Sequence, residues 1–128
     1  MSSGYNHIDV DELKKRGVQV GNCPKIADDA VATFAVLLAL AASRRYTEAR
    51  FLMENNRWVS SSNRQWMLGQ DLAGSTVGII GLGGIGQTIV KRLKGFCVGS
   101  SCIPDRERKK EAGPLGVKYV SLDHLLRK

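Results

Sequence analysis

Three glycines at fixed spacing are the residues of this 128-residue chain that point most clearly to chemistry. The turn reads Gly81-x-Gly83-x-x-Gly86, a spacing typical of loops that hold a dinucleotide. In such a loop Gly81 allows a tight bend, Gly83 lets a pyrophosphate approach the backbone, and Gly86 lets a helix pack close to a strand. The helix N-terminus then offers free N–H groups to the phosphates. The pattern predicts dinucleotide binding, and a glycine-rich turn in another kind of α/β protein stays open as the alternative.

The elements around these glycines have the order that the turn requires. A short apolar strand is predicted before them, and an amphipathic helix opens on them and ends at Gly95. The apolar stripe of that helix consists of Ile85, Ile89, Val90 and Leu93. The predicted elements in chain order are strand 76–80, the helix, strand 97–103, strand 116–120 and a helix over 122–126. This alternation predicts an α/β fold with a doubly wound parallel sheet in the strand order 3-2-1.

The end of the second predicted strand should select the cofactor. An acidic residue about 20 positions after the glycines holds the ribose 2′-hydroxyl of NAD, whereas an arginine accommodates the 2′-phosphate of NADP. Asp105 lies 19 residues after the last glycine, and Arg106 is next. Three further basic residues follow: Arg108, Lys109 and Lys110. This cluster favours NADP(H) over NAD(H), although a solvated charge run is the alternative interpretation.

The N-terminal half is expected to be mainly helical. A short helix is predicted over 9–16, a strand over 18–20, a long helix over 28–54 and an irregular arm over 55–70 that contains Trp58 and Trp66. Asp28 or Asp29 is expected to cap the long helix. Its first half is apolar on every face and needs cover on every face, which points to a further domain or a partner subunit. We therefore expect marginal stability for the chain alone.

Composition excludes several classes of protein. The chain is 43% hydrophobic and 24% charged, which is typical of a globular protein. Its net charge of +7 comes mostly from residues 91–128, but no aromatic residues interleave with the basic cluster, so nucleic acid is not the expected partner. The three cysteines (Cys23, Cys97 and Cys102) lack metal-ligand spacing and are expected to be reduced and mostly buried. The longest apolar run, 30–42, is too short for a membrane span, and no leader is recognised, so we expect a cytoplasmic protein.

Several separate stretches resemble one family, the D-isomer-specific 2-hydroxyacid dehydrogenases, and within it the glyoxylate/hydroxypyruvate reductases. The stretches that carry the resemblance are 1–9 (MSSGYNHID), 15–22 (KRGVQVGN), 29–32 (DAVA), 40–45 (LAASRR), 76–87 (TVGIIGLGGIGQ) and 119–126 (YVSLDHLL). They occur in family order and at family spacing along nearly the whole chain. The resemblance implies a partial Rossmann nucleotide-binding domain and the NAD(P)H-dependent reduction of a small 2-keto acid to the 2-hydroxy acid.

The resemblance also implies roles for particular residues. The loop at Ser3 and Gly4 matches the one that contacts the substrate carboxylate through its backbone, with Ser3 in place of the usual valine. The turn containing Gly83, Gly84 and Ile85 matches the pyrophosphate-binding turn, and Gly84 replaces the usual arginine. Arg106 matches the arginine that reads the NADPH phosphate. The family's interface lies in the region 28–70, so a homodimer is expected.

No catalytic residue is expected in this chain. The family's substrate-binding arginine and its histidine–glutamate pair are expected beyond Lys128, and the two histidines, His7 and His124, match positions outside the active site. Residues 1–22 resemble the end of the first part of the substrate domain, and 23–128 the first half of the nucleotide domain. The chain therefore resembles an internal fragment of a reductase that is inactive by itself. The alternative is a genuine short protein that binds a dinucleotide or pairs with a full-length subunit.

Overall fold

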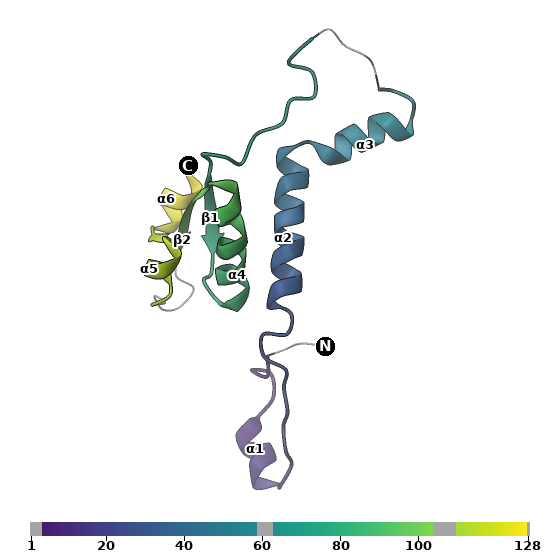
Figure 1. The fold of residues 1–128 in the computed structure, drawn as a ribbon. Coiled ribbons are helices and arrows are strands. Elements are labelled where there is room, and N and C mark those ends of the chain that lie inside the picture. Colours follow the sequence, from purple (N-terminus) through teal and green to yellow (C-terminus); the bar gives the residue numbers. More distant parts are fainter. Residues whose placement is uncertain (1–3, 59–62, 104–109, 128) are drawn as a thin grey trace.

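The fold consists of a small parallel sheet with helices around it and a helical segment that precedes it. The computed structural model describes residues 4–58, 63–103 and 110–127. In chain order the elements are α1 (Val10–Lys15), α2 (Asp28–Ser43), α3 (Tyr46–Glu54), β1 (Thr76–Ile80), α4 (Gly84–Leu93), the 3-10 helix η1 (Lys94–Phe96), β2 (Gly99–Ile103), α5 (Ala112–Leu115), β3 (Lys118–Tyr119) and α6 (Leu122–Leu126). α2 runs beside α4, and α1 lies apart from the sheet (Figure 1).

The sheet confirms the predicted α/β architecture. Its three strands are parallel and lie in the order β1-β2-β3, with Thr76 opposite Gly99 and Ile80 opposite Ile103. Parallel neighbours need a crossover connection, and α4 supplies it between β1 and β2. β1 is an edge of this sheet, and its Ile80 side chain is 70% exposed.

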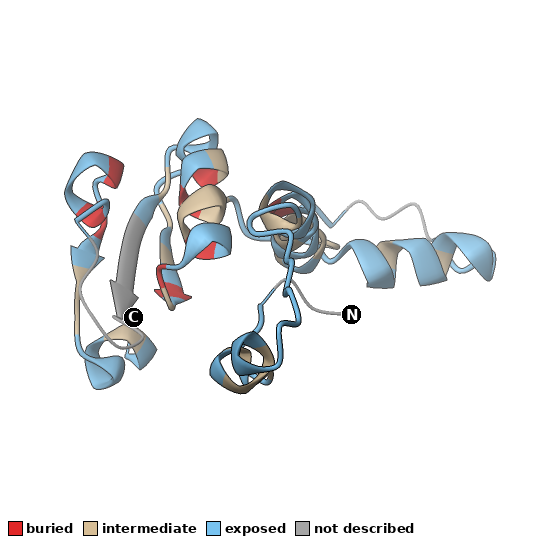
Figure 2. Ribbon diagram, turned by 90° about the horizontal axis from the view of Figure 1, so that it is seen from below, coloured by how far each residue is buried: buried red, intermediate tan, exposed pale blue. Residues whose placement is uncertain are grey.

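The core lies between β1, α4 and α5. The buried residues of this cluster are Ile79, Leu82, Val90, Ala112, Leu115 and Val117. Figure 2 shows that buried positions concentrate on α4, on the turn before it and on α5. The predicted apolar stripe of α4 is confirmed at Val90 and Leu93, whereas Ile85 is 38% exposed. α4 ends at Leu93, and the 3-10 helix η1, which contains Gly95, follows it directly. The prediction that Gly95 ends the helical segment is therefore wrong.

The predicted helix over 28–54 is wrong in one respect, because the chain breaks it into α2 and α3. Arg45 adopts the left-handed conformation at φ 53° between the two helices. The backbone N–H of Gln70 donates to the Ser43 carbonyl oxygen at 2.7 Å, and Gly69 lies so close that a Cβ there would overlap the same oxygen. A contact from a distant segment therefore accompanies the break, at a place where the sequence has neither proline nor glycine.

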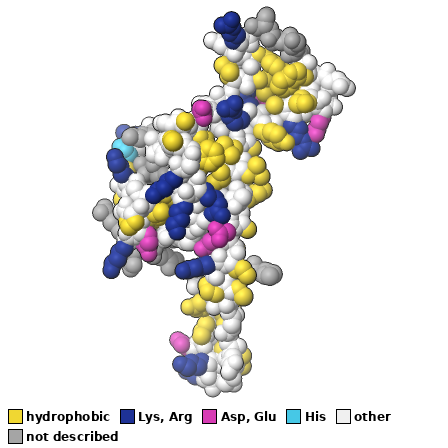
Figure 3. All heavy atoms as spheres, viewed as in Figure 1, with side chains coloured by type: hydrophobic (Ala, Val, Ile, Leu, Met, Phe, Trp, Pro, Cys, Tyr) yellow, Lys and Arg dark blue, Asp and Glu magenta, His cyan; other side chains and the backbone are white. Residues whose placement is uncertain are grey.

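α2, which corresponds to the apolar first half of the predicted helix, is covered on one face only by the described residues. Ala32 and Val36 are buried, and α2 packs on α4. The residues left 43–58% exposed are Val31, Phe34, Leu37 and Leu38. Hydrophobic side chains are visible on the surface along α2 and around α3 (Figure 3). The described residues therefore cover α2 on one face, and cover of its other faces by a further domain or a partner subunit stays a prediction.

Three further expectations need correction. Residues 18–20 form no strand, because no neighbouring strand pairs with them, and Val18 is 50% exposed. Neither Asp28 nor Asp29 caps α2, since Ala27 is its N-cap and both carboxylates lie in the first turn. Cys23 and Cys97 are exposed rather than buried, because both lie outside the packed elements.

The predicted short helix is confirmed as α1, with Asp9 accepting a hydrogen bond from the N–H of Glu12 at 2.9 Å.

The two tryptophans of the predicted arm contact each other. Their ring centroids are 4.8 Å apart and the rings are inclined by 76°, an edge-to-face arrangement. Within the described residues the arm contains neither helix nor strand, as predicted.

None of the described helices is both long and apolar enough to cross a bilayer.

Candidate nucleotide-binding site

The glycine turn joins the carboxyl end of β1 to the start of α4. Gly81 has φ +90°, a conformation that residues with a Cβ rarely adopt, so it makes the bend that the sequence predicts. Gly83 is the N-cap of α4, and a Cβ built there meets nothing within 4 Å. Gly86 is buried, and a Cβ there would overlap the Gly81 carbonyl oxygen. Each glycine therefore has the geometry expected of its position.

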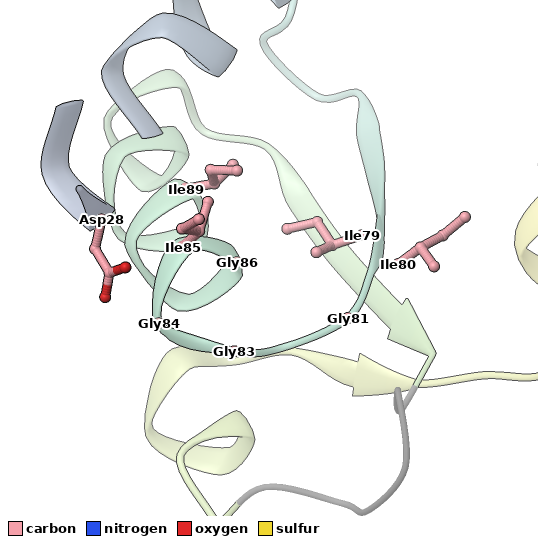
Figure 4. A pocket seen from close by; sticks show the side chains of 9 residues that line it. All are labelled: Asp28, Ile79, Ile80, Gly81, Gly83, Gly84, Ile85, Gly86 and Ile89. Carbon is pink, nitrogen blue, oxygen red and sulfur yellow. The ribbon is translucent and has the colours of Figure 1, made fainter. Parts of the chain in front are cut away.

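The turn borders an open pocket of about 330 Å³. The residues that line it are Asp28, Ile79, Ile80, Gly81, Gly83, Gly84, Ile85, Gly86 and Ile89. Ile79 points from β1 toward α4, whereas Ile80 points the opposite way (Figure 4). Four isoleucines make the pocket apolar, and the glycines leave backbone groups accessible. Such a mixture suits a ligand with a charged, hydrogen-bonding part and a less polar part.

The N-terminus of α4 supplies the hydrogen-bond donors of the pocket. The first intrahelical bond runs from the Gln87 N–H to the Gly83 carbonyl oxygen at 2.9 Å. The N–H groups before Gln87 have no acceptor inside the helix, and the positive end of the dipole lies with them. The side-chain amide of Gln87 donates to the Leu82 carbonyl oxygen at 3.1 Å, which ties the turn to the helix. The residues present therefore fit the diphosphate of a dinucleotide.

The charges near the pocket are arranged less favourably for an anion. The basic residues of α4, Lys91 and Arg92, lie in its last turn. Arg92 reaches Asp29 at 2.9 Å, an ion pair that joins α4 to the start of α2. The charged side chain that lines the pocket is Asp28. Away from the pocket, on α3, a hydrogen bond to Glu54 and the negative charge of that side chain raise the pKa of Arg50.

The structure brings together five of the predicted cofactor residues in this pocket: Gly81, Gly83, Gly84, Ile85 and Gly86. Gly4 is exposed and does not line it, while Ser3 and Arg106 lie outside the described residues. His7 and His124 are exposed and are also absent from its lining. Within the described part of the chain no three His, Cys, Asp or Glu side chains are grouped to hold a metal ion.

The sequence does not assign Asp28, Ile79, Ile80 or Ile89 to the site, and of these Asp28 carries a charge. Asp28 precedes the glycines by more than 50 positions, and the sequence pattern places it at the start of a helix. No local pattern links it to the turn, because its position there depends on the packing of α2 against α4. Only a prediction that these two helices pack together would have placed Asp28 at the turn.

Comparisons with known proteins agree with this geometry. Residues 36–128 match the family described as D-isomer specific 2-hydroxyacid dehydrogenase, NAD binding domain. The chain is 41% identical to a glyoxylate reductase of Thermococcus kodakarensis over 128 residues, and 43% identical to the human glyoxylate reductase/hydroxypyruvate reductase over 126 residues. These matches cover 97% and 98% of this chain but 38% of each relative. The chain thus spans little more than a third of their length.

Solved structures give the same result. A protein from Thermus thermophilus superposes with a TM-score of 0.81 at 30% identity, over 98% of this chain and 38% of that one. A glyoxylate reductase from Paecilomyes thermophila gives a TM-score of 0.74 at 30% identity, over 98% of this chain and 37% of that one. The strand–glycine turn–helix unit is therefore part of a Rossmann-type NAD-binding domain. The chain belongs to the D-isomer specific 2-hydroxyacid dehydrogenase family.

Proposed function

We propose that this chain holds the diphosphate of a nicotinamide dinucleotide and takes part in the reduction of glyoxylate or hydroxypyruvate to the 2-hydroxy acid. The observation that carries this proposal is the turn at Gly81–Gly86, whose bend, open face and close helix packing suit a diphosphate. The names of the relatives support the choice of substrate class. The bound cofactor supplies the hydride.

In this proposal the residues of the chain bind and orient rather than transfer protons. Gly83, Gly84 and Ile85 present backbone groups at the N-terminus of α4 to the diphosphate. Ser3 and Gly4 hold the substrate carboxylate through the backbone, in a segment (1–22) that belongs to the substrate domain, while 23–128 belongs to the nucleotide domain. The arginine and the histidine–glutamate pair of the family are not assigned to any residue here, so the 128 residues alone bind without turnover.

A binding and activity assay on the purified chain tests both parts. We expect calorimetry to detect binding of NADPH to the chain. We expect no loss of NADPH absorbance after hydroxypyruvate or glyoxylate is added. Failure to bind any dinucleotide would contradict the proposed role of the turn. Turnover by the chain alone would contradict the proposal that none of these 128 residues is a catalytic group.

We further propose that NADP(H) is preferred over NAD(H) through Arg106. Replacing Arg106 by alanine is expected to weaken NADPH binding about 10- to 100-fold, because a charge-assisted hydrogen bond to the phosphate is lost. NADH lacks that phosphate, so its affinity should change little. Arg108→Ala, in the same basic cluster, is the control. Equal losses for both cofactors, or in both variants, would show that Arg106 does not read the 2′-phosphate.

A homodimer formed through residues 28–70 is the proposed assembly. Phe34, Leu37 and Leu38 support it, since they are 53–58% exposed on a continuous helix face. Leu38→Arg is expected to convert a dimer into a monomer in sedimentation velocity, because a buried guanidinium without a partner is costly. Leu126→Arg, at a position that is 71% exposed on α6, should leave the dimer intact. A wild-type chain that sediments as a monomer at high concentration would refute this assembly.

A further inference from the structure

The carboxylate of Asp28 occupies the side-chain position of Gly84. A Cβ built on Gly84 would overlap the Oδ2 atom of Asp28 and lie 2.9 Å from its Cγ. Figure 4 shows Asp28 at the start of α2, with its carboxylate beside the first turn of α4. A side chain at position 84 would require the Asp28 carboxylate to move, so the glycine permits the carboxylate to lie where it does.

The carboxylate also lies at the helix end that a diphosphate would use. Asp28 and Gly83–Gly86 line the same pocket. The ion pairs of the described residues do not involve Asp28, whereas its neighbour Asp29 is paired with Arg92 at 2.9 Å. A carboxylate near a helix N-terminus is stabilised by the dipole and by the free N–H groups. Asp28 therefore takes the position of an anion at this helix end.

We propose that Asp28 is a specificity-determining residue that lowers the affinity of the glycine turn for a diphosphate; this inference rests on the proposed dinucleotide-binding function. A carboxylate and a diphosphate repel each other, and both are attracted to the same helix end. Binding of a dinucleotide then requires Asp28 to move away or to remain close at an electrostatic cost. Ligands without phosphate do not meet this cost.

Replacement of Asp28 by asparagine tests the proposal, because the amide keeps the shape and removes the charge. Calorimetry of the full 128-residue chain with NADPH and with inorganic pyrophosphate should show roughly tenfold tighter binding by Asp28→Asn, as expected for removal of one nearby like charge. Adenosine, which lacks phosphate, should bind both proteins equally. Asp28→Ser is a second variant that removes the charge and retains a small polar group at the helix start.

Asp29→Asn is the matched control. It removes the same charge from the next residue of the same helix end, but Asp29 does not line the pocket. We expect less than about a twofold change in its NADPH affinity, because the Asp29 side chain is 84% exposed and its charge is well screened by solvent. Ionic strength gives an independent measure: between about 0.1 M and 1 M salt the Debye length falls from roughly 10 Å to 3 Å, so the advantage of Asp28→Asn should shrink.

The outcomes separate this inference from the function on which it rests. Equal or weaker NADPH and pyrophosphate binding by both Asp28 variants, with wild-type binding retained, would overturn the inference and leave the proposed function intact. An equal gain in Asp29→Asn would also overturn it, since the effect would then be one of overall charge. Absence of dinucleotide binding in the wild type and in both Asp28 variants would overturn the proposed function and the inference together.

Discussion

Replacing Gly86 by valine is expected to destabilise the βαβ unit by about 3 kcal/mol, the upper end of the usual cost of overpacking, because the new side chain has no space between α4 and the turn. A Cβ at this position would overlap the Gly81 carbonyl oxygen and lie 3.6 Å from the Ile79 side chain. Backbone cannot move aside as a side chain does, so α4 must shift away from β1. Thermal unfolding followed by circular dichroism should show a decrease in Tm of roughly 10 °C.

The same substitution is expected to abolish dinucleotide binding. The N–H groups of α4 are aimed by the close contact of Gly86 with the turn, and a displaced helix no longer directs them at the pocket. Gly95→Ala is the matched control, since a Cβ at Gly95 meets nothing within 4 Å and its φ is not positive. That control should be neutral or slightly stabilising, by less than about 1 kcal/mol. A Gly86→Val protein with wild-type Tm would show that the helix does not pack as described.

Leu82→Ala is expected to cost about 2–5 kcal/mol of unfolding free energy, the range for a buried leucine that leaves a cavity. Leu82 is 2% exposed although it stands within the glycine turn, so it anchors the turn to the core. Urea denaturation should give a lower midpoint, and calorimetry should give weaker NADPH binding, because a loosened turn holds the diphosphate less well.

The contrast with an exposed leucine makes this prediction specific. Leu126 is 71% exposed on α6, and its replacement by alanine should change the unfolding free energy by less than about 0.5 kcal/mol. Similar losses in Leu82→Ala and Leu126→Ala would mean that the turn is not anchored by burial.

The βαβ unit was predictable from sequence because its signals are local. The strand, the glycine spacing and the helix stripe lie within about 20 consecutive residues, and each glycine needs a backbone feature that only its immediate neighbours set. The parallel order of the three strands follows from the same alternation of strands and helices. These elements agree in position with the structure to within a few residues.

The features that escaped prediction depend on distant segments. The break after Ser43 accompanies contacts from Gly69 and Gln70, and no helix-breaking residue marks it. Val18–Val20 alternates like a strand, but alternation does not provide a neighbouring strand to pair with. Asp28 reaches the glycine turn only through the packing of α2 on α4.

The packing of α2 against α4 has a consequence for the order of folding. The ion pair between the two helices joins residues 63 positions apart, whereas β1 and β2 pair across a single short crossover. Closing the longer loop costs more chain entropy, so the crossover unit should form before α2 docks. Pulse-labelled hydrogen exchange should therefore protect the amides of β1 and α4 before those of α2. The chain then assembles from its later residues toward its earlier ones, opposite to the direction in which a ribosome releases it.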